Sequence, residues 1–496
     1  MSDSFDRATC YQAIQAKDVR FDGRLFIGVK TTGIYCRPIC PARTPQEQNC
    51  DFFRSAAAAQ QAGFRSCLRC RPELSPQLWS HIGTGVTVNR ALNLIAAGAL
   101  DRDSVSDLAR RVGIGDRHLR QLFHQHLGTS PTAVAQTGRV LLAKQLVTET
   151  DLSMTDVAMA AGFGSIRRFN TVMQQCYDRP PSELRRSRVA GRPTASSPAR
   201  AISNPTITLK LPFSPPYPWT STIEWLANRA IPGMESVDRD GYHRLISING
   251  HQGTVQIRPA PDLPYLLASI SFPELGLLSQ IVARLNRLFD LHANVGAIAD
   301  YLRTDSVLIP AIEYRPGVRI PGCWDVFELA VRAILGQQVS VAAATTLARR
   351  LVATYGEPAT QPTADLYRTF PSPAVLANAD LTRIGVTKPR AKAISSLAAA
   401  IELDPTLLQL HQGLEDTVER LCRLPGIGPW TAQYIAMRAL GELDAFPATD
   451  LALVRAMNKL GESTTKESLD TRSQQWRPWR AYAAMYLWAW DGRVAD

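Results

Sequence analysis

The sequence contains no long hydrophobic run and few cysteines beyond its first 70 residues. No stretch of 18 or more apolar residues occurs in the 496-residue chain, which excludes a membrane-spanning helix of ordinary length. The N-terminus, MSDSFDRATCYQ, lacks the basic-then-apolar order of a signal peptide, so we expect a cytoplasmic protein with no membrane partner. Six of the nine cysteines lie within residues 1–70. In a reducing compartment this clustering favours metal binding over disulfides.

Acidic residues are outnumbered by basic ones. The chain has 44 Asp and Glu against 55 Lys and Arg, and its formal net charge is +11. The excess comes mainly from arginine, whose planar guanidinium binds phosphate oxygens in pairs. Double-stranded DNA is therefore the first partner to test, although charge alone is weak support for it.

The pattern along the chain predicts a multidomain α+β fold. Residues 1–80 hold the clustered cysteines and are expected to form a small zinc-bound α/β domain. Residues 85–188 alternate helical patterns with short turns and predict an all-α double helix-turn-helix domain. Residues 189–204, rich in Arg, Ser, Ala and Pro, are expected to form a linker. Period-two alternation predicts a small antiparallel sheet with one helix over 205–290, and helical spacing predicts an all-α domain over 291–496.

Two cysteine pairs predict a zinc site. Their spacing is C-x3-C, 26 residues, then C-x2-C, which supplies ligands from two neighbouring loops, as tetrahedral thiolate coordination requires. Cys50 lies just before an aromatic run and is expected to pack rather than to bind metal. From spacing alone the zinc would only hold the domain together. The expected ligands are Cys36, Cys40, Cys67 and Cys70.

The residues around these cysteines favour a second role. LFIGVKTTGIYCRPICPAR and AGFRSCLRCRPEL resemble the N-terminal domain of the Ada adaptive-response family, which repairs methylphosphotriesters in DNA, over about 70 residues. The resemblance implies that Cys36 takes the methyl group irreversibly, and zinc would keep its thiol deprotonated. Methylation would remove one negative charge from the site and so strengthen DNA binding. The residues that the resemblance places against the DNA backbone are Thr32, Arg43 and Arg69.

Two later segments each show a helix, a glycine turn and a second helix. They are DSVSDLARRVGIGDRHLRQLFHQHLGTSP and LSMTDVAMAAGFGSIRRFNTVMQQCYDRPPSEL, the latter with Ser153 and Asp156 spaced like a capping box. Together they resemble the AraC-type transcription-factor domain, which implies sequence-specific DNA binding and RNA polymerase as a further partner. The residues near the starts of the two expected recognition helices, where groove contact is expected, are Arg117, His118, Arg120, Arg167, Arg168 and Asn170.

The segment RLPGIGPWTAQYIAMRAL carries a helix-hairpin-helix pattern. Its Gly426 and Gly428 let backbone N–H groups approach a DNA phosphate closely. Asp450 follows Trp430 by twenty residues and precedes a helix. A lone Asp in that place is more often a helix cap, but a hairpin followed by a carboxylate at this spacing is typical of the helix-hairpin-helix DNA glycosylase superfamily. That resemblance implies a monovalent cation on the carbonyls of Cys422, Leu424 and Ile427.

Nearly all of residues 205–496 resemble the AlkA-type 3-methyladenine DNA glycosylases, on the segments SPPYPWTSTIEWLANRA, RIPGCWDVFELAVRAILGQQVSVAAAT and WRPWRAYAAMYLW. The resemblance implies that Asp450 supports an oxocarbenium-like transition state and that Gln338 stands at the wedge position. Trp430 replaces the lysine of bifunctional members, which predicts base excision without strand cleavage. Stacking a cationic alkylated purine on aromatic rings is worth about 0.5 to 2 kcal/mol. The implied base pocket consists of Trp225, Trp430, Tyr434 and Trp488.

Two alternatives remain open at this point. In one, the chain is a transcription regulator whose C-terminal half clamps DNA without chemistry. In the other, the zinc is purely structural. A Pro-Cys-His-Arg motif, on which the other methyltransferase half of Ada proteins relies, is absent around Cys323 and Cys422, so direct reversal of O6-methylguanine is not expected.

Overall fold

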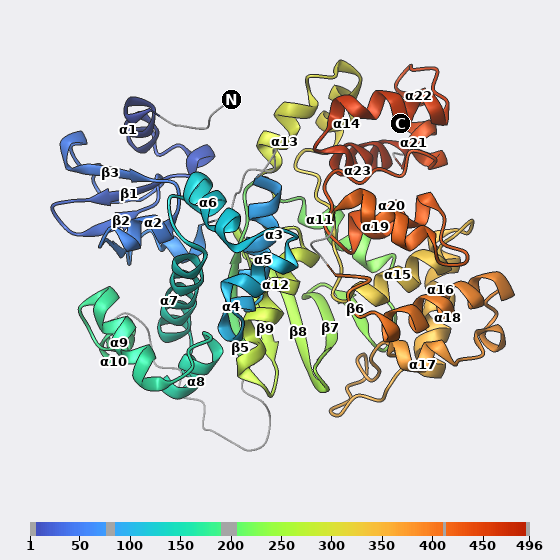
Figure 1. The fold of residues 1–496 in the computed structure, drawn as a ribbon, viewed down its shortest axis with the longest axis horizontal. Coiled ribbons are helices and arrows are strands. Elements are labelled where there is room, and N and C mark those ends of the chain that lie inside the picture. Colours follow the sequence, from blue (N-terminus) through green and yellow to red (C-terminus); the bar gives the residue numbers. More distant parts are fainter. Residues whose placement is uncertain (1–5, 76–84, 190–205, 410–412, 493–496) are drawn as a thin grey trace. The chain divides into compact units, whose positions relative to one another are not determined.

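The computed structural model describes residues 6–75, 85–189, 206–409 and 413–492 (Figure 1). All but the first residue of the linker expected over 189–204 lies outside the described residues. The chain divides into two compact units, Met1–Pro212 with Leu267–Ala283 and Phe213–Leu266 with Arg284–Asp496. Within the described ranges, no helix is both long enough and apolar enough to cross a membrane.

The N-terminal unit begins with a four-stranded sheet of order β3-β1-β2-β4. Strand β1 pairs antiparallel with β2 and β3, whereas β2 and β4 run parallel. Helix α2 contacts all four strands (Figure 1). This small α/β fold agrees with the expectation for the cysteine-rich segment. The elements are α1 (Arg7–Gln15), β1 (Phe26–Val29), β2 (Ile34–Cys36), β3 (Cys50–Phe53), α2 (Ala56–Gln61) and β4 (Arg65–Ser66), followed by the 3-10 turn η3 (Pro72–Leu74).

Eight helices follow in the described part of this unit. The first helix-turn-helix pairs α5 with α6 and the second pairs α8 with α9, while the long helix α7 joins them. Ser104 starts α5 with a full capping box to Asp107. Ser153 caps α8 by accepting the Asp156 N–H at 3.1 Å, which is one half of the capping box that its spacing suggested. The helices are α3 (Gly85–Ala96), α4 (Ala99–Arg102), α5 (Val105–Arg111), α6 (Asp116–Leu127), α7 (Pro131–Glu149), α8 (Met154–Ala160), α9 (Ile166–Tyr177) and α10 (Pro181–Val189).

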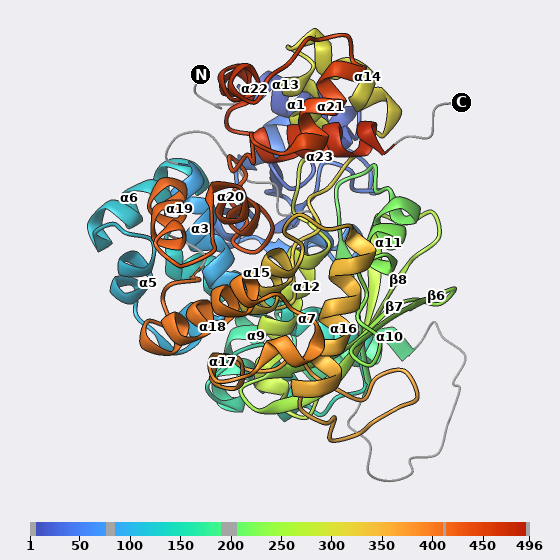
Figure 2. The ribbon, with the colours of Figure 1, turned by 90° about the vertical axis from the view of Figure 1, so that its right-hand side faces the viewer.

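The second sheet has five strands in the order β5-β9-β8-β7-β6. Pairs β6/β7 and β7/β8 are antiparallel, and burial alternates along β5 and β9, as the period-two pattern predicted. Helix α11 contacts β6 and β7 (Figure 2). The short strand β6 was not expected from the sequence. The elements are β5 (Thr206–Pro212), α11 (Trp219–Ala227), β6 (Glu235–Asp238), β7 (Gly241–Ile248), β8 (His251–Pro259) and β9 (Tyr265–Ser271).

Helices dominate the described chain after β9, as predicted. Two large hydrophobic clusters hold them together, one centred on α23 and one on α15, α18 and α20. The elements are α12 (Leu278–Leu288), α13 (Val295–Leu302), α14 (Ile309–Tyr314), α15 (Val326–Leu335), α16 (Val341–Tyr355), α17 (Pro373–Ala377), α18 (Lys388–Leu403), α19 (Leu414–Cys422), α20 (Pro429–Arg438), α21 (Leu451–Lys459), α22 (Lys466–Ser473) and α23 (Arg480–Asp491).

Candidate functional site

Four cysteine sulfurs gather beside the N-terminal sheet. Their Sγ atoms all lie within 4.8 Å of one another. Four thiolates bound to zinc at about 2.3 Å place their sulfur atoms about 3.8 Å apart, so this set fits one tetrahedral zinc ion. Cys50 is fully buried in a separate cluster with Cys10, as expected for a packing residue. The four residues are Cys36, Cys40, Cys67 and Cys70.

Cys36 differs from the other three cysteines. It ends β2 and is half-buried, whereas the others are buried. The Arg37 N–H donates to Cys70 Sγ at 3.3 Å, and the Arg69 N–H donates to Cys67 Sγ at 3.4 Å. Such hydrogen bonds draw electron density from a sulfur ligand. Within the described residues no backbone N–H donates to the Cys36 sulfur, which therefore keeps its electron density.

A buried ion pair fixes the loop after Cys36. The Arg37 side chain is paired with Asp22, and Arg37 Nε donates to Asp22 Oδ1 at 2.8 Å. Arg37 Nη1 also donates to the Cys70 carbonyl oxygen at 3.2 Å, while Ser75 Oγ donates to Asp22 Oδ1 at 3.2 Å. The two cysteine loops are therefore joined by protein contacts as well as by the metal that they would share.

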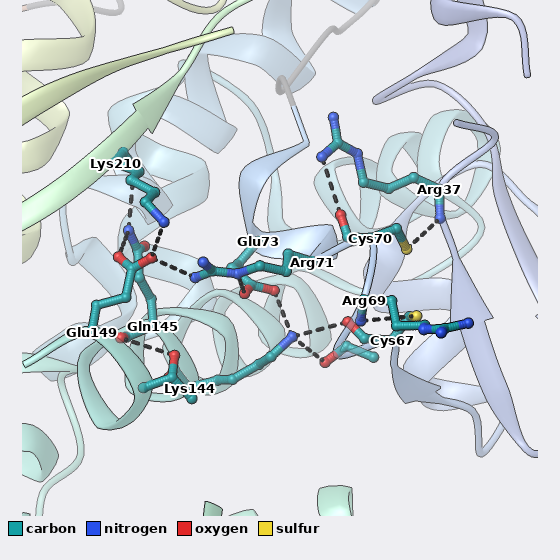
Figure 3. Close-up of polar contacts among 12 residues, drawn as sticks. Arg37, Cys67, Arg69, Cys70, Arg71, Glu73, Lys144, Gln145, Glu149 and Lys210 are labelled. Carbon is teal, nitrogen blue, oxygen red and sulfur yellow. Dashed lines mark hydrogen bonds and ion pairs between the residues drawn. The ribbon is translucent and has the colours of Figure 1, made fainter. Parts of the chain in front are cut away.

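A second network joins the cysteine loops to helix α7 (Figure 3). Lys144 Nζ donates to Glu73 Oε2 at 2.7 Å and to the Cys67 carbonyl oxygen at 3.1 Å. Both side chains of this ion pair are only 2% exposed. Arg71 extends the network by pairing with Glu73 at 2.9 Å and with Glu149 at 2.6 Å, and Glu149 pairs with Lys210 at 3.1 Å. The zinc-binding loop and the helix between the two helix-turn-helix pairs are thus packed as one body.

The residues expected to contact DNA in this unit are all exposed. Those of the two recognition helices lie on the first turns of α6 and α9, beside Leu119 and Phe169, which point inward and are fully buried. Arg120 Nε donates to Asp116 Oδ1 at 2.7 Å on the same helix. The structure places these residues where DNA can reach them. They are Thr32, Arg43, Arg69, Arg117, His118, Arg120, Arg167, Arg168 and Asn170.

The helix-hairpin-helix lies between α19 and α20. Gly426 has φ 78°, and a Cβ built there would approach the Ala393 Cβ to 2.7 Å, so both backbone and packing require glycine. Gly428 is the N-cap of α20. Both glycines are exposed, and Gln337 Nε2 supports the turn by donating to the Gly426 carbonyl oxygen at 2.9 Å. The hairpin therefore presents backbone N–H groups at an exposed helix N-terminus, which suits a phosphate.

Asp450 is both a helix cap and part of a cavity wall. Its Oδ1 accepts the N–H groups of Ala452 at 2.8 Å and Leu453 at 3.2 Å, at the start of α21. Two indole N–H groups also donate to it, Trp430 to Oδ2 at 2.8 Å and Trp488 to Oδ1 at 3.2 Å. Both oxygens are thus used, and the carboxylate is held in one orientation facing a cavity of about 650 Å³.

The four aromatic residues expected in the base pocket line this same cavity. Trp430 and Tyr434 stack on each other with centroids 5.3 Å apart and planes 12° apart. Tyr434 and Trp488 are tilted, with centroids 6.1 Å apart. The Trp225 ring contacts two guanidiniums. All four aromatic residues are only partly buried. The structure brings together residues that are separated by more than 260 positions in the sequence.

The sequence patterns did not predict two residues of the cavity, Arg229 and Arg438. Arg229 Cζ lies 3.9 Å from the Trp225 ring centroid, and Arg438 Cζ lies 4.1 Å from it. Arg438 Nη1 donates to the Tyr434 hydroxyl at 2.7 Å. Burial lowers the pKa of Arg438, and burial lowers that of Arg229 to about 10. Each arginine lies four positions after a pocket aromatic on a helical pattern, and that spacing could have found them.

Gln338 lies in the turn between α15 and α16. Its φ is 53°, in the left-handed region that few residues other than glycine adopt, and it is exposed. The neighbouring Gln337 carbonyl oxygen accepts a hydrogen bond from Arg390, which supports the turn. The Gln338 side chain is thus presented to solvent on a tight turn between two helices.

Four known families match successive parts of the chain. Residues 9–73 match the metal binding domain of Ada, and residues 108–187 match a helix-turn-helix domain. Residues 208–325 match the AlkA N-terminal domain, and residues 331–481 match the HhH-GPD superfamily of base excision DNA repair proteins. The order of the four matches agrees with the one expected from the sequence.

Individual relatives agree with these matches. The chain is 42% identical over 489 residues, 98% of its length and 97% of the relative's, to a Mycobacterium tuberculosis protein named probable bifunctional transcriptional activator/DNA repair enzyme AlkA. It is 34% identical over 290 residues, 58% of its length and 98% of the relative's, to DNA-3-methyladenine glycosylase 2 of Escherichia coli. The solved 3-methyladenine DNA glycosylase of Archaeoglobus fulgidus shares the fold, with a TM-score of 0.51 and 23% identity over 57% of this chain and 98% of that one.

The buried Lys144–Glu73 pair yields a stability prediction. Lys144→Met leaves the buried Glu73 carboxylate with only one of its two cations, Arg71, which should cost about 1.5 to 3 kcal/mol in the free energy of unfolding. Zinc release from the zinc-loaded protein, followed as urea is increased, measures the free energy of unfolding of the N-terminal unit. Lys210→Met, which removes a more exposed cation of the same network, should cost about 1 kcal/mol or less. Equal midpoints for the two variants would contradict the assignment.

Proposed function

Because the chain belongs to the family of bifunctional transcriptional activator/DNA repair enzymes of the AlkA type, we propose that Cys36 is its methyl acceptor and Asp450 its base-excision carboxylate. The protein combines a methyl-accepting zinc domain, a helix-turn-helix regulator and a 3-methyladenine-type DNA glycosylase, and it acts on DNA. The observation that carries the excision proposal is the placement of Asp450 and four aromatic side chains around one cavity.

Methyl transfer requires a reachable, electron-rich sulfur, and the proposal for Cys36 is supported because it alone of the four cysteines is not buried and no backbone N–H in the described residues donates to it. Cys36, Cys40, Cys67 and Cys70 would hold zinc, which supplies a positive charge that keeps the thiols deprotonated. The Cys36 sulfur then forms a bond to the methyl carbon of a methylphosphotriester. The carbon–oxygen bond breaks, and its electron pair leaves with the phosphate diester. No nearby group restores the thioether to a thiol, so each molecule accepts one methyl group.

Base excision requires negative charge beside the developing oxocarbenium ion, with the base held out of the duplex. Asp450 supplies that charge, and the Trp430 and Trp488 indoles fix its direction. The target base would occupy the cavity lined by Trp225, Trp430, Tyr434 and Trp488. With Trp430 in place of a lysine there is no amine to form a Schiff base, so the strand stays intact.

The remaining DNA contacts are proposed from the positions of exposed residues. Gly426 and Gly428 are proposed to bind a DNA phosphate, and Gln338 to enter the gap left by the flipped base. A monovalent cation at the hairpin carbonyls, RNA polymerase as a partner and a cytoplasmic location stay predictions of the sequence. The exposed residues of the zinc domain and the recognition helices, described above, are proposed as the further DNA contacts.

The acceptor role of Cys36 is tested by mass spectrometry. We expect the zinc-loaded protein, after incubation with a duplex that carries a methylphosphotriester, to gain the mass of one methylene group on the peptide that contains Cys36. The half-buried Cys176 serves as an internal control and should stay unmodified. A methyl group on Cys40, Cys67 or Cys70 would overturn the assignment, and an unmodified protein would leave the zinc with a structural role only.

The role of Asp450 is tested by Asp450→Asn. Asn caps helices about as well as Asp, so the fold should persist, whereas loss of the negative charge should slow excision of 7-methylguanine about 100-fold or more under single-turnover conditions. Asp325→Asn is the matched control, because Asp325 also caps a helix but does not line the cavity. Background-level release by the wild type and by Asp450→Asn would instead favour a regulator whose C-terminal half only clamps DNA.

A further inference from the structure

The cavity that would receive the base carries an excess of positive charge. Seven arginines and three carboxylates line it. Arg244 and Arg332 are compensated, because both pair with the buried carboxylates Glu235 and Glu328. Within the described residues, neither Arg229 nor Arg438 has a carboxylate partner. In the same ranges Arg315 and Arg319 also line the cavity without a carboxylate ion pair, but only Arg229 and Arg438 lie against the Trp225 ring.

The Trp225 ring lies between the guanidiniums of Arg229 and Arg438 and brings them together. Their Cζ atoms lie 3.9 Å and 4.1 Å from its ring centroid, both closer than the usual limit of about 6 Å for a cation over an aromatic ring. Arg438 also lies 5.5 Å from the Tyr434 centroid and donates to its hydroxyl. The electron-rich rings expected to attract a cationic base thus already hold protein cations, and these cations repel a second positive charge.

Arg438 is held firmly in this position. Its side chain is buried, Nε donates to the Pro321 carbonyl oxygen, and Nη2 donates to the Gly322 carbonyl oxygen at 3.3 Å. Arg229 is only partly buried, and its Nη1 donates to the Trp225 carbonyl oxygen at 3.2 Å. Arg229 can therefore be replaced with less damage to the fold than Arg438.

We propose that Arg229 and Arg438, grouped around Trp225, are specificity-determining residues that favour release of uncharged purines, which leave as anions, over release of cationic ones. This inference rests on the proposed base excision at Asp450. When the C1′–N9 bond of an uncharged purine breaks, both electrons go to the base, and the guanidiniums stabilise the resulting anion. Water then adds to C1′ and loses a proton, and the base anion takes up a proton. A cationic purine leaves uncharged, so, measured from the free enzyme and duplex, its release gains nothing from the same guanidiniums: they weaken its binding by as much as they help its departure.

The test compares two substrates in the full-length protein. Single-turnover excision is measured, at enzyme concentrations well below saturation so that the rate includes binding, from one duplex containing 7-methylguanine, which is cationic, and from another containing hypoxanthine, which is uncharged. Arg229→Met should raise the ratio of the 7-methylguanine rate to the hypoxanthine rate about tenfold, because it removes one nearby positive charge. Arg229→Lys, which keeps the charge, should leave that ratio within about twofold of the wild-type value.

A purely structural role for Arg229 would slow both reactions by the same factor and leave the ratio unchanged. An unchanged ratio in Arg229→Met, or a change in favour of hypoxanthine, overturns the inference. Arg438→Met, checked for folding by its melting curve, should change the ratio in the same direction. If the wild type releases neither base, the proposed excision at Asp450 fails and this inference fails with it, whereas release with an unaltered ratio rejects the inference alone.

Discussion

The hydrogen bonds to the Asp450 carboxylate determine the geometry of the whole cavity. Two backbone N–H groups at the start of α21 and two indole N–H groups from α20 and α23 converge on its two oxygens. A helix cap and a catalytic carboxylate are usually alternative interpretations of an aspartate. Here one side chain is proposed to serve as both, since the cap fixes its backbone and one oxygen while Trp430 and Trp488 orient the carboxylate towards the cavity.

A different constraint organises the N-terminal unit. The cysteine loops carry Glu73 into a buried position, where it meets Lys144 of α7. Helix α7 lies between the two helix-turn-helix pairs. A displacement of the cysteine loops must therefore either move that helix or break the buried Lys144–Glu73 ion pair. The change of charge proposed for Cys36 methylation would therefore occur in a domain that is packed against α7, the helix between the two helix-turn-helix pairs.

Local patterns in the sequence predicted much of this architecture. The two cysteine pairs, the paired helix-turn-helix segments and the glycine hairpin are short-range features, and each forms where its spacing placed it. Contacts between distant positions could not be predicted. Glu73 and Lys144 lie 71 positions apart, and Trp225 and Arg438 lie 213 apart. Nothing in either segment alone indicates such a partner, so the meeting of Arg229 and Arg438 at one ring became apparent only in the folded chain.

We propose that Asp450 acts through its negative charge on a cationic transition state. Binding of two uncleavable duplexes tests it directly, one with a cationic pyrrolidine in place of the target sugar and the other with an uncharged tetrahydrofuran. The wild type should bind the pyrrolidine duplex at least about tenfold more tightly than the tetrahydrofuran duplex, and Asp450→Asn should lose this preference. An equal preference in Asp450→Asn, or none in the wild type, would contradict it.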